Sequence, residues 1–321
     1  MEKVVVTDYA FPSLEVEEEV LAPLGCAVVG AQCRTPEELK RLVADADCVL
    51  TQFARVDADV IAAMQKARAI VRYGIGVDNV DLKAAAAKGI PVCNVPDYCV
   101  DEVADHTLAF ILALARQVVR HTVSVRSGHW GLAVPLADMR TLRDMTVGIV
   151  GFGRIGRAVA ERLAPFRPRR LAHDPFVPAE KVRALGCEAV DRDRLLAESD
   201  LLTLHCPSTP ETRRFINFRT ISRMKERALL VNVGRGDLVE TDALVQALEN
   251  GRLAGAALDV CDPEPIPASS PLLRMRNVIL APHVASASPK ATRTLRETAA
   301  KIAAAALRRE PLPNIVNGVK A

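Results

Sequence analysis

Residues 146–156 read TVGIVGFGRIG, and this stretch decides the fold. The first five residues predict a buried strand, and apolar residues recur at helical spacing beyond Gly156. Between them, three glycines have the spacing G-x-G-x-x-G. In a strand–turn–helix, Gly151 permits the tight turn, Gly153 lets a pyrophosphate approach the backbone, and Gly156 lets the helix pack on the strand. The stretch therefore predicts a dinucleotide-binding unit.

Asp174 stands 18 residues beyond Gly156, at the end of the next predicted strand. A carboxylate there can accept hydrogen bonds from both ribose hydroxyls of NAD, and its charge would repel the 2′-phosphate of NADP. The free N–H groups at the start of the helix would hold the phosphates. This context favours a cofactor site over a glycine turn with a surface aspartate, and it predicts NAD(H) as the cofactor.

Strands and helices alternate along the rest of the chain, which predicts parallel sheets covered on both faces. Strands are predicted at residues 4–6, 27–29, 48–50, 69–71, 91–93, 146–150, 170–173, 201–205, 229–233, 256–260 and 278–280. Helices are predicted at residues 15–24, 81–88, 100–126 and 289–309. Another helix is predicted to start at residues 35–38, where Thr, Pro and two Glu combine a cap, a first-turn proline and a capping box.

Composition excludes several classes of protein. The chain has 42 Lys and Arg against 39 Asp and Glu, too balanced for a surface that neutralises nucleic acid. No run of 18 apolar residues occurs, and residues 1–10 lack a secretory signal, so we expect no membrane segment. The eight cysteines form no C-x-x-C pair, which indicates reduced thiols in the cytoplasm and no metal site. At about 150 residues per domain, 321 residues suggest two domains.

Three polar residues follow predicted strands at the carboxyl ends, where open α/β sheets bind their ligands. Arg235 is suited to gripping a carboxylate with two hydrogen bonds. His283 is suited to exchanging a proton near neutral pH. Glu264 lies in a Pro-flanked loop, and beside His283 it would favour the imidazolium. Each residue taken singly could also be solvated or structural, so spacing alone leaves both interpretations open.

The motifs together resemble those of the D-isomer-specific 2-hydroxyacid dehydrogenases, in the same order and over nearly the whole chain. The motifs are residues 151–156, 232–236, 258–260, 264–265 and 282–283, and residues 72–81 resemble the family's substrate loop. Residues 93–96 and 204–206 are similar to the branch that contains the C-terminal-binding proteins, which are NAD-binding transcriptional corepressors.

The resemblance implies an α/β fold of two Rossmann-like, doubly wound parallel-sheet domains with an active cleft between them. A flavodoxin-like substrate domain would comprise residues 1–99 and 288–321, and an NAD-binding domain residues 100–287. The helix near residues 100–126 and the arm through Trp130 match the family's two-fold contact, which implies a homodimer.

For the site, the resemblance makes His283 the general acid/base, Glu264 its partner and Arg235 the residue that orients the substrate. Arg72, Gly74, Ile75 and Gly76 would form the substrate loop, whose backbone N–H groups receive the carboxylate. Asp259 would hold the nicotinamide carboxamide, and Pro207 would line the adenine pocket. The residues expected around the cofactor are Gly151, Gly153, Arg154, Ile155, Gly156, Thr107, Asp174, His205, Cys206, Pro207, Thr212, Val233 and Asp259.

The expected substrate is a small 2-keto acid such as glyoxylate, hydroxypyruvate or pyruvate. The substrate loop has no cationic side chain besides that of Arg72. Its expected apolar neighbours are Ile75 and Phe53. Burying a phosphate without a cationic partner is energetically costly. Arg55 could supply the missing charge, which leaves 3-phosphoglycerate dehydrogenase as an alternative. A non-enzymatic NAD(H)-binding co-regulator is the other alternative, because the corepressor branch keeps the same catalytic set.

Overall fold

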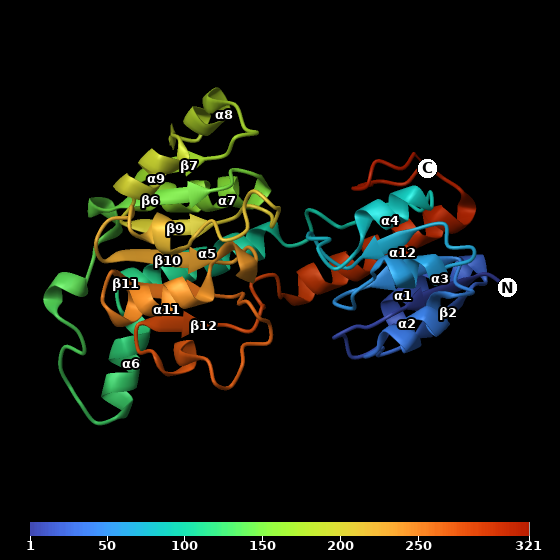
Figure 1. The fold of residues 1–321 in the computed structure, drawn as a ribbon, viewed down its shortest axis with the longest axis horizontal. Coiled ribbons are helices and arrows are strands. Elements are labelled where there is room, and N and C mark those ends of the chain that lie inside the picture. The colour runs from blue at the N-terminus through green and yellow to red at the C-terminus, as the bar shows by residue number, and fades with distance from the viewer. Residues whose placement is uncertain (321) are drawn as a thin grey trace. The chain divides into compact units, whose positions relative to one another are not determined.

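The computed structural model describes residues 1–320, and the chain divides into two compact units. The first unit consists of Met1–Tyr98 and of the chain from Ser288 onward, and the second is Cys99–Ala287. Each unit has its own parallel sheet covered by helices (Figure 1).

The first unit contains a five-stranded sheet with the order β2-β1-β3-β4-β5. Its strands are β1 (Lys3–Val6), β2 (Ala27–Gly30), β3 (Cys48–Thr51), β4 (Ile70–Arg72) and β5 (Val92–Cys93). Its helices are α1 (Glu15–Leu21), α2 (Pro36–Val43), α3 (Ala58–Ala63), α4 (Leu82–Ala87) and α12 (Pro289–Arg308). All its strand pairs are parallel, and the order is that of flavodoxin-like folds.

Alternation along the strands divides the first unit's core into two layers. Val4 and Val6 pack with α1 and α12 on one face of the sheet, whereas Val5 packs with α2, α3 and α4 on the other. The predicted capping box is confirmed at α2, where Thr35 accepts from the Glu38 amide and the Glu38 side chain accepts from the Thr35 amide. Both faces are thus covered, as continuous apolar strands require.

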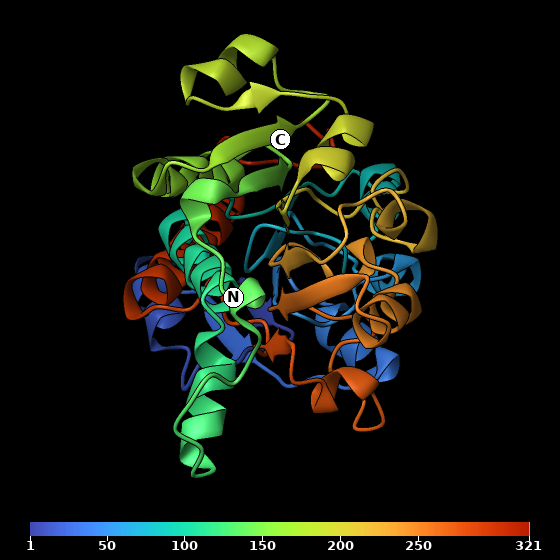
Figure 2. The ribbon, with the colours of Figure 1, turned by 90° about the vertical axis from the view of Figure 1, so that its left-hand side faces the viewer.

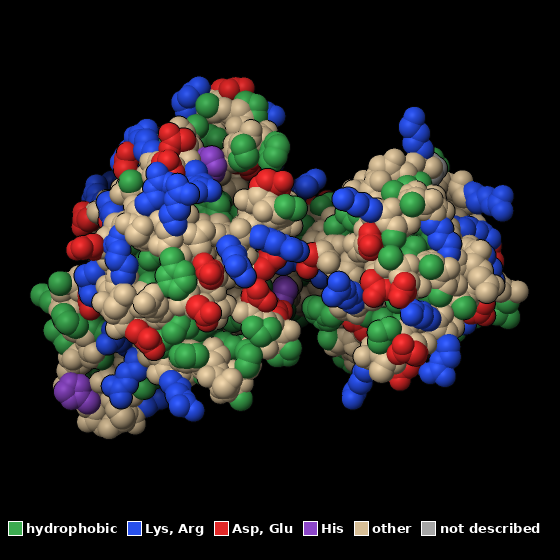
Figure 3. Space-filling view, viewed as in Figure 1, with side chains coloured by type: hydrophobic (Ala, Val, Ile, Leu, Met, Phe, Trp, Pro, Cys, Tyr) green, Lys and Arg blue, Asp and Glu red, His purple; other side chains and the backbone are tan. Residues whose placement is uncertain are grey.

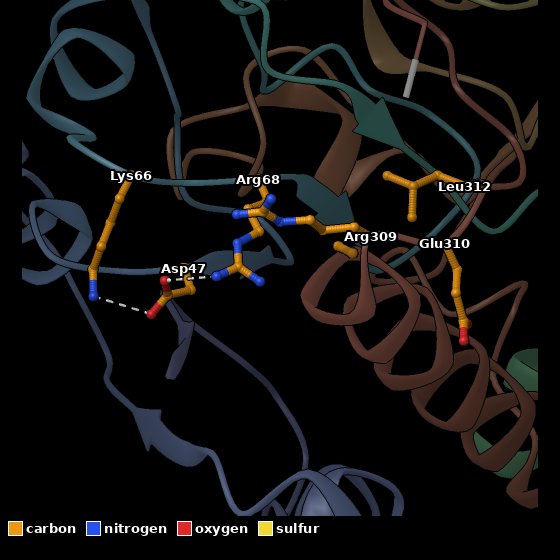
Figure 4. A pocket seen from close by; sticks show the side chains of 7 residues that line it. Asp47, Lys66, Arg68, Arg309, Glu310 and Leu312 are labelled. Atoms are coloured by element: carbon orange, nitrogen blue, oxygen red, sulfur yellow. Dashed lines mark ion pairs between the residues drawn. The ribbon is translucent and has the colours of Figure 1, made fainter. Parts of the chain in front are cut away.

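A pocket of the first unit lies beside the end of α12, and three of its charged side chains, Asp47, Lys66 and Arg68, bind one another (Figure 4). Asp47 accepts from Lys66 Nζ at 3.1 Å and lies 3.7 Å from Arg68 Nη2. Arg68 Nη1 also donates to the carbonyl of Leu307 at 2.6 Å. These contacts tie the segment before β4 to α12, so we assign them a structural role.

The second unit contains a seven-stranded sheet with the order β12-β11-β10-β9-β6-β7-β8. Its strands are β6 (Thr146–Val150), β7 (Arg169–His173), β8 (Glu188–Ala189), β9 (Leu201–Leu204), β10 (Ala228–Asn232), β11 (Leu253–Leu258) and β12 (Val278–Leu280). Its helices are α5 (Val100–Ala115), α6 (Val118–Arg126), α7 (Arg154–Leu163), α8 (Ala179–Ala184), α9 (Arg192–Glu198), α10 (Phe218–Ile221) and α11 (Thr241–Glu249).

The strand order of the second unit reverses between β6 and β9, as in dinucleotide-binding sheets. Helices α5 and α7 pack on one face of the sheet, and α9, α10 and α11 pack on the other. The two doubly wound parallel sheets confirm the predicted α/β fold class. Ligands of such sheets bind at the carboxyl ends of the strands beside the reversal, where the loops after β6 and β9 lie.

The single helix predicted over residues 100–126 is wrong, because α5 and α6 are separate and bent by 63°. Gln117 takes a left-handed backbone with φ of 55°, and its side chain donates to the carbonyl of Leu114 at 2.9 Å. A left-handed residue ends a helix, but neither Gly nor Pro marks this break in the sequence. Within residues 1–320 no single helix is long and apolar enough to span a membrane, although α5 and α6 taken together meet that length and composition.

Candidate active site

The glycine loop after β6 fits the pyrophosphate of a dinucleotide. Gly151 has φ of 85°, and a Cβ there would lie 2.7 Å from the backbone nitrogen of Cys206. A Cβ at Gly156 would lie 2.1 Å from the Gly151 carbonyl oxygen, whereas one at Gly153 would meet nothing within 4 Å. No side chain caps the amino end of α7, so its first N–H groups stay open to an anion.

Asp174 follows β7 directly, and its side chain holds the conformation of the glycine loop. Its Oδ2 accepts from the amide of Phe152 at 2.7 Å, and its Oδ1 accepts from the amide of Phe176 at 2.9 Å. Each carboxylate oxygen has a further lone pair that ribose hydroxyls can use. These two hydrogen bonds therefore fix the orientation of the carboxylate before a ribose binds.

His205 and Cys206 follow β9 and form the wall next to the glycine loop. The Nε2 of His205 lies 2.9 Å from the hydroxyl of Thr203, and its Nδ1 is buried without a partner among residues 1–320. Burial lowers the pKa of His205 to about 3, so the ring is uncharged at neutral pH and has one N–H donor and one acceptor nitrogen. Burial also raises the pKa of Cys206 to about 11, so this thiol is no nucleophile. The unpartnered Nδ1 suits a polar group of a bound cofactor.

The remaining cofactor residues hold the surrounding structure. Thr212 donates to the carbonyl of Pro207 at 2.7 Å and closes the loop that follows Cys206. Thr107 is fully buried in α5 and donates to Val103 at 2.7 Å, so its hydroxyl already has a partner. Val233 comes directly after β10, and Arg154 and Ile155 open α7. The contacts predicted for these residues with the cofactor stay predictions.

Strands β10, β11 and β12 bring the catalytic candidates to one edge of the sheet. The register pairs the last residues of the three strands, Asn232, Leu258 and Leu280. The loops that leave these ends carry Arg235, Glu264 and His283. The predicted constellation is therefore assembled by the parallel register.

Glu264 and His283 form a short charged contact. The Nδ1 of His283 lies 2.6 Å from Oε1 of Glu264, and Oε2 accepts from the amide of Cys261 at 3.4 Å. Partial burial works to raise the pKa of Glu264, but the hydrogen bond and charge of His283 outweigh it, with help from the charge of Arg235. The net effect lowers the pKa of Glu264, so this carboxylate is ionised at neutral pH.

Asp259 holds the turn that carries His283, a role that the sequence did not reveal. His283 has φ of 56°, and its amide donates to the Asp259 carbonyl at 2.8 Å. The amides of Val284 and Ala285 donate to the two carboxylate oxygens of Asp259 at 2.8 and 2.9 Å. Asp259 is only 2% exposed, so it acts first as the anchor of the catalytic turn. Its predicted contact with the nicotinamide carboxamide stays a prediction.

Asn232 holds the backbone of the loop that carries Arg235. Its Nδ2 donates to the carbonyl of Arg235 at 2.8 Å, and its Oδ1 accepts from the amide of Gly234 at 3.1 Å. Asn232 is fully buried at the end of β10, and Arg235 Nη1 donates to the Gly234 carbonyl at 2.8 Å. The sequence does contain a signal for this role of Asn232, because an amide side chain at the end of an apolar strand needs hydrogen-bond partners when it is buried.

The substrate-loop candidates lie in the first unit, after β4. The carbonyl of Gly74 accepts from Val95 at 3.0 Å, and that of Ile75 accepts from the Asn94 side chain at 2.6 Å. Because N–H and C=O of a trans peptide point in opposite directions, the N–H groups of Ile75 and Gly76 point away from that segment. Over residues 1–320 neither of these two N–H groups has an acceptor. They form an adjacent donor pair suited to a carboxylate.

The N–H of Gly74, which was also expected to receive the carboxylate, is already used within the loop. The Gly74 N–H donates to the carbonyl of Arg72 at 2.9 Å, so Ile75 takes its place beside Gly76. Gly74 has φ of 142°, and a Cβ there would lie 1.4 Å from Nη1 of Arg72. The Arg72 guanidinium therefore covers Gly74, which adds positive charge to the loop.

Comparison with known proteins decides the family. The model for the NAD-binding domain of the D-isomer specific 2-hydroxyacid dehydrogenases matches residues 108–285. The chain belongs to this family. It is an NAD-dependent D-2-hydroxyacid dehydrogenase, and the predicted cofactor is thereby confirmed. The predicted likeness to the corepressor branch stays a prediction.

Three relatives show the range of named activities. A glyoxylate reductase of Korarchaeum cryptofilum is 42% identical over 82% of this chain and 80% of its own. A D-3-phosphoglycerate dehydrogenase of Methanocaldococcus jannaschii is 37% identical over 99% of this chain, which spans only 60% of that relative. The structure of D-lactate dehydrogenase from Aquifex aeolicus, complexed with NAD and lactic acid, has a TM-score of 0.86 at 29% identity and covers 96% of both chains.

Replacing Asp174 by Ala should narrow the preference of this dehydrogenase for NADH over NADPH by about tenfold, because the charge that repels a 2′-phosphate is removed. Steady-state kinetics with both cofactors measures the ratio of kcat/KM values. Asp193→Ala, on the exposed start of α9, is the matched control and should leave the ratio unchanged. A wild-type protein that uses NADPH as well as NADH would contradict the role of Asp174.

Proposed function

We propose that this dehydrogenase reduces a small 2-keto acid to the D-2-hydroxy acid, with His283 as the general acid. The observation that carries the proposal is the 2.6 Å contact between His283 and ionised Glu264, on a turn held by Asp259. NADH supplies the hydride that adds to the carbonyl carbon. Protonated His283 donates its proton to the carbonyl oxygen, and the reverse reaction needs His283 neutral.

Arg235 orients the substrate by its guanidinium, which can hold carboxylate and carbonyl oxygens at once. In the first unit, the open N–H groups of Ile75 and Gly76 suit a substrate carboxylate. The apolar side chains of Ile75 and Phe53, the latter 57% exposed, suit a small uncharged R group. These features support glyoxylate, hydroxypyruvate or pyruvate as the substrate.

A phosphorylated substrate, 3-phosphohydroxypyruvate, is the second candidate. Arg55 is exposed in the loop after β3 and has no hydrogen bond or ion pair within residues 1–320. Arg72 already covers Gly74, so the two side chains could supply the charge that a phosphate needs. The likeness to a D-3-phosphoglycerate dehydrogenase adds support for this candidate.

A panel of acids tests both candidates. The purified protein is given NADH with glyoxylate, hydroxypyruvate, pyruvate and 3-phosphohydroxypyruvate, and kcat/KM is measured for each. We expect hydroxypyruvate to exceed its 3-phospho form. A clear preference for the phosphorylated acid that is lost in Arg55→Gln would establish the second candidate. Binding of NADH without turnover of any acid would favour a non-enzymatic co-regulator.

Replacing Glu264 by Gln should shift the pH dependence of reduction. The lowered pKa of Glu264 keeps it negative at neutral pH, and this charge lies 2.6 Å from the imidazole of His283. Without this negative charge beside the proposed general acid, the fall in reduction rate on the alkaline side should move down by about one pH unit. Glu180→Gln on exposed α8 is the control. An unchanged pH–rate profile in Glu264→Gln would reject the assigned role.

We propose that the protein is a homodimer joined through α6 and the arm that follows it. Helix α6 projects from the second unit (Figure 2), and apolar side chains gather along the arm that follows it, at the left edge of Figure 3. Seven of them are strongly exposed in the single chain: Val118, Val119, Val123, Val125, Trp130, Leu132 and Leu136. Exposed apolar side chains gathered on one segment indicate an interaction site, and a second copy would bury them.

Light scattering at micromolar concentration should give twice the chain mass of 34.7 kDa. Trp130 is the chain's single tryptophan and is 91% exposed, so its fluorescence should shift to shorter wavelength as the dimer forms. The variant Trp130→Glu should weaken the dimer. A monomer with a concentration-independent spectrum would contradict the proposal.

A further inference from the structure

A buried polar network lies directly behind the substrate loop of the first unit. Glu17 of α1 is fully buried, and its Oε2 accepts from Nη2 of Arg296 in α12 at 2.6 Å. Its Oε1 accepts from Nε of Arg296 at 3.0 Å and from the hydroxyl of Tyr73 at 3.1 Å. Arg296 also donates to the carbonyl of Ser13 at 2.6 Å. The carboxylate thus binds a helix and the start of the substrate loop at once.

Aromatic packing encloses the same network. The Phe11 ring lies 4.8 Å from the Arg296 guanidinium carbon and 5.4 Å from the Tyr73 ring centroid, edge to face. Burial, and then the charge of Glu17, raise the pKa of Tyr73 far above its usual range. The hydroxyl therefore keeps its proton and remains a donor to Glu17.

Tyr73 is the last residue before the loop departs from the strand direction. Its amide donates to the carbonyl of Thr51 in β3 at 2.8 Å, and the next residue, Gly74, has φ of 142°. From there the carbonyl of Gly74 points to Val95, which leaves the N–H of Ile75 pointing the opposite way. Any rotation at Tyr73 therefore turns the donor pair of Ile75 and Gly76.

We propose that Tyr73 is a positioning residue for the substrate carboxylate, held by Glu17 and Arg296 so that the N–H groups of Ile75 and Gly76 keep one direction. The inference rests on the proposed function for one point only, that the anion bound by these N–H groups is the carboxylate of a substrate. Tyr73 touches no substrate. Its 1% exposure and its hydrogen bond to a buried ion pair place it one residue behind the donors.

The test is Tyr73→Phe in the full chain, which keeps the ring on Phe11 and removes only the hydroxyl. Glu17 retains its contacts with Arg296, so the ion pair survives. We expect KM for glyoxylate to rise on the order of tenfold, because a donor pair out of place weakens binding. We expect kcat and the Kd of NADH to change less than about twofold. The carboxylate contact stabilises the bound substrate and the transition state equally, so its loss raises KM alone.

Amide hydrogen exchange gives a readout that does not depend on turnover. The Val95 amide, which donates to Gly74, should exchange about tenfold faster in Tyr73→Phe, whereas amides within β3 should be unchanged. Tyr9→Phe is the matched control. The Tyr9 ring stacks with Phe11 at a centroid distance of 6.5 Å, and its hydroxyl makes no hydrogen bond within the described chain.

The outcomes separate the two proposals. Faster Val95 exchange with a raised KM supports the inference, and wild-type exchange or wild-type KM in Tyr73→Phe overturns it. If the wild-type protein reduces no 2-keto acid, the proposed function fails, but Val95 exchange still decides whether Tyr73 holds the loop. If Tyr73→Phe does not fold, Asn94→Ala frees the Ile75 carbonyl without touching the ion pair. It should raise KM to a similar degree, and an unchanged KM would overturn the inference.

Discussion

Replacing His283 by Ala is expected to lower kcat for 2-keto acid reduction by at least about 10³-fold while NADH binding survives. His283 is the proton donor in the proposed reaction, and a positioned general acid contributes about 10² to 10⁴-fold. Alanine has no group that can replace it. Stopped-flow kinetics measures the hydride step, and NADH fluorescence measures binding in the same variant.

The backbone at His283 calls for a second variant. Its φ of 56° is left-handed, which strains alanine more than asparagine. His283→Asn therefore keeps the turn held by Asp259 and removes only the proton donor. Both variants should lose turnover alike. Substantial reduction by His283→Asn would mean that the imidazole does not supply the proton.

Replacing Arg235 by Lys is expected to lower kcat/KM by on the order of 10²-fold or more. An ammonium cannot make the two parallel contacts of a guanidinium, so the substrate loses its orientation. The loss should appear with every 2-keto acid, because it concerns the shared carboxylate and carbonyl. Kinetics over the acid panel measures it.

Arg219→Lys is the matched control, since Arg219 lies exposed on α10 and undergoes the same chemical change. Its kcat/KM should equal that of the wild-type protein. Near-normal efficiency of Arg235→Lys would exclude Arg235 as the substrate clamp. The backbone of the loop should survive the change, because Asn232 binds the main chain at Arg235 and Gly234.

Sequence reasoning succeeded where local rules apply. The strand and glycine spacing around Gly151 predicted the dinucleotide unit, because each glycine has a steric reason that a single chain reveals. Arg235, Glu264 and His283 were singled out because they follow strands, and parallel strands bring such residues to one edge. Their roles came from the family resemblance and stay predictions. The capping box at Thr35 was equally local.

Sequence reasoning failed where tertiary contacts decide. The break at Gln117 has no glycine or proline to mark it. The donor pair after β4 depends on hydrogen bonds from Asn94 and Val95, which fix which carbonyls are occupied. The anchoring of the His283 turn by the Asp259 carboxylate was not predicted, and the predicted contact of Asp259 with the cofactor stays a prediction. None of these contacts leaves a periodic or compositional signal.

The position of α12 has a consequence for synthesis of the protein. This helix supplies Leu295, Ala299, Ile302 and Leu307 to the core face that also contains β1, β3 and β4. The whole second unit, Cys99–Ala287, is translated between those strands and their covering helix. A nascent chain thus completes its second unit first, reversing the usual N-terminal order. Until the last segment leaves the ribosome, α1 is the only helix on this face of the first sheet, so the part that α12 covers stays exposed.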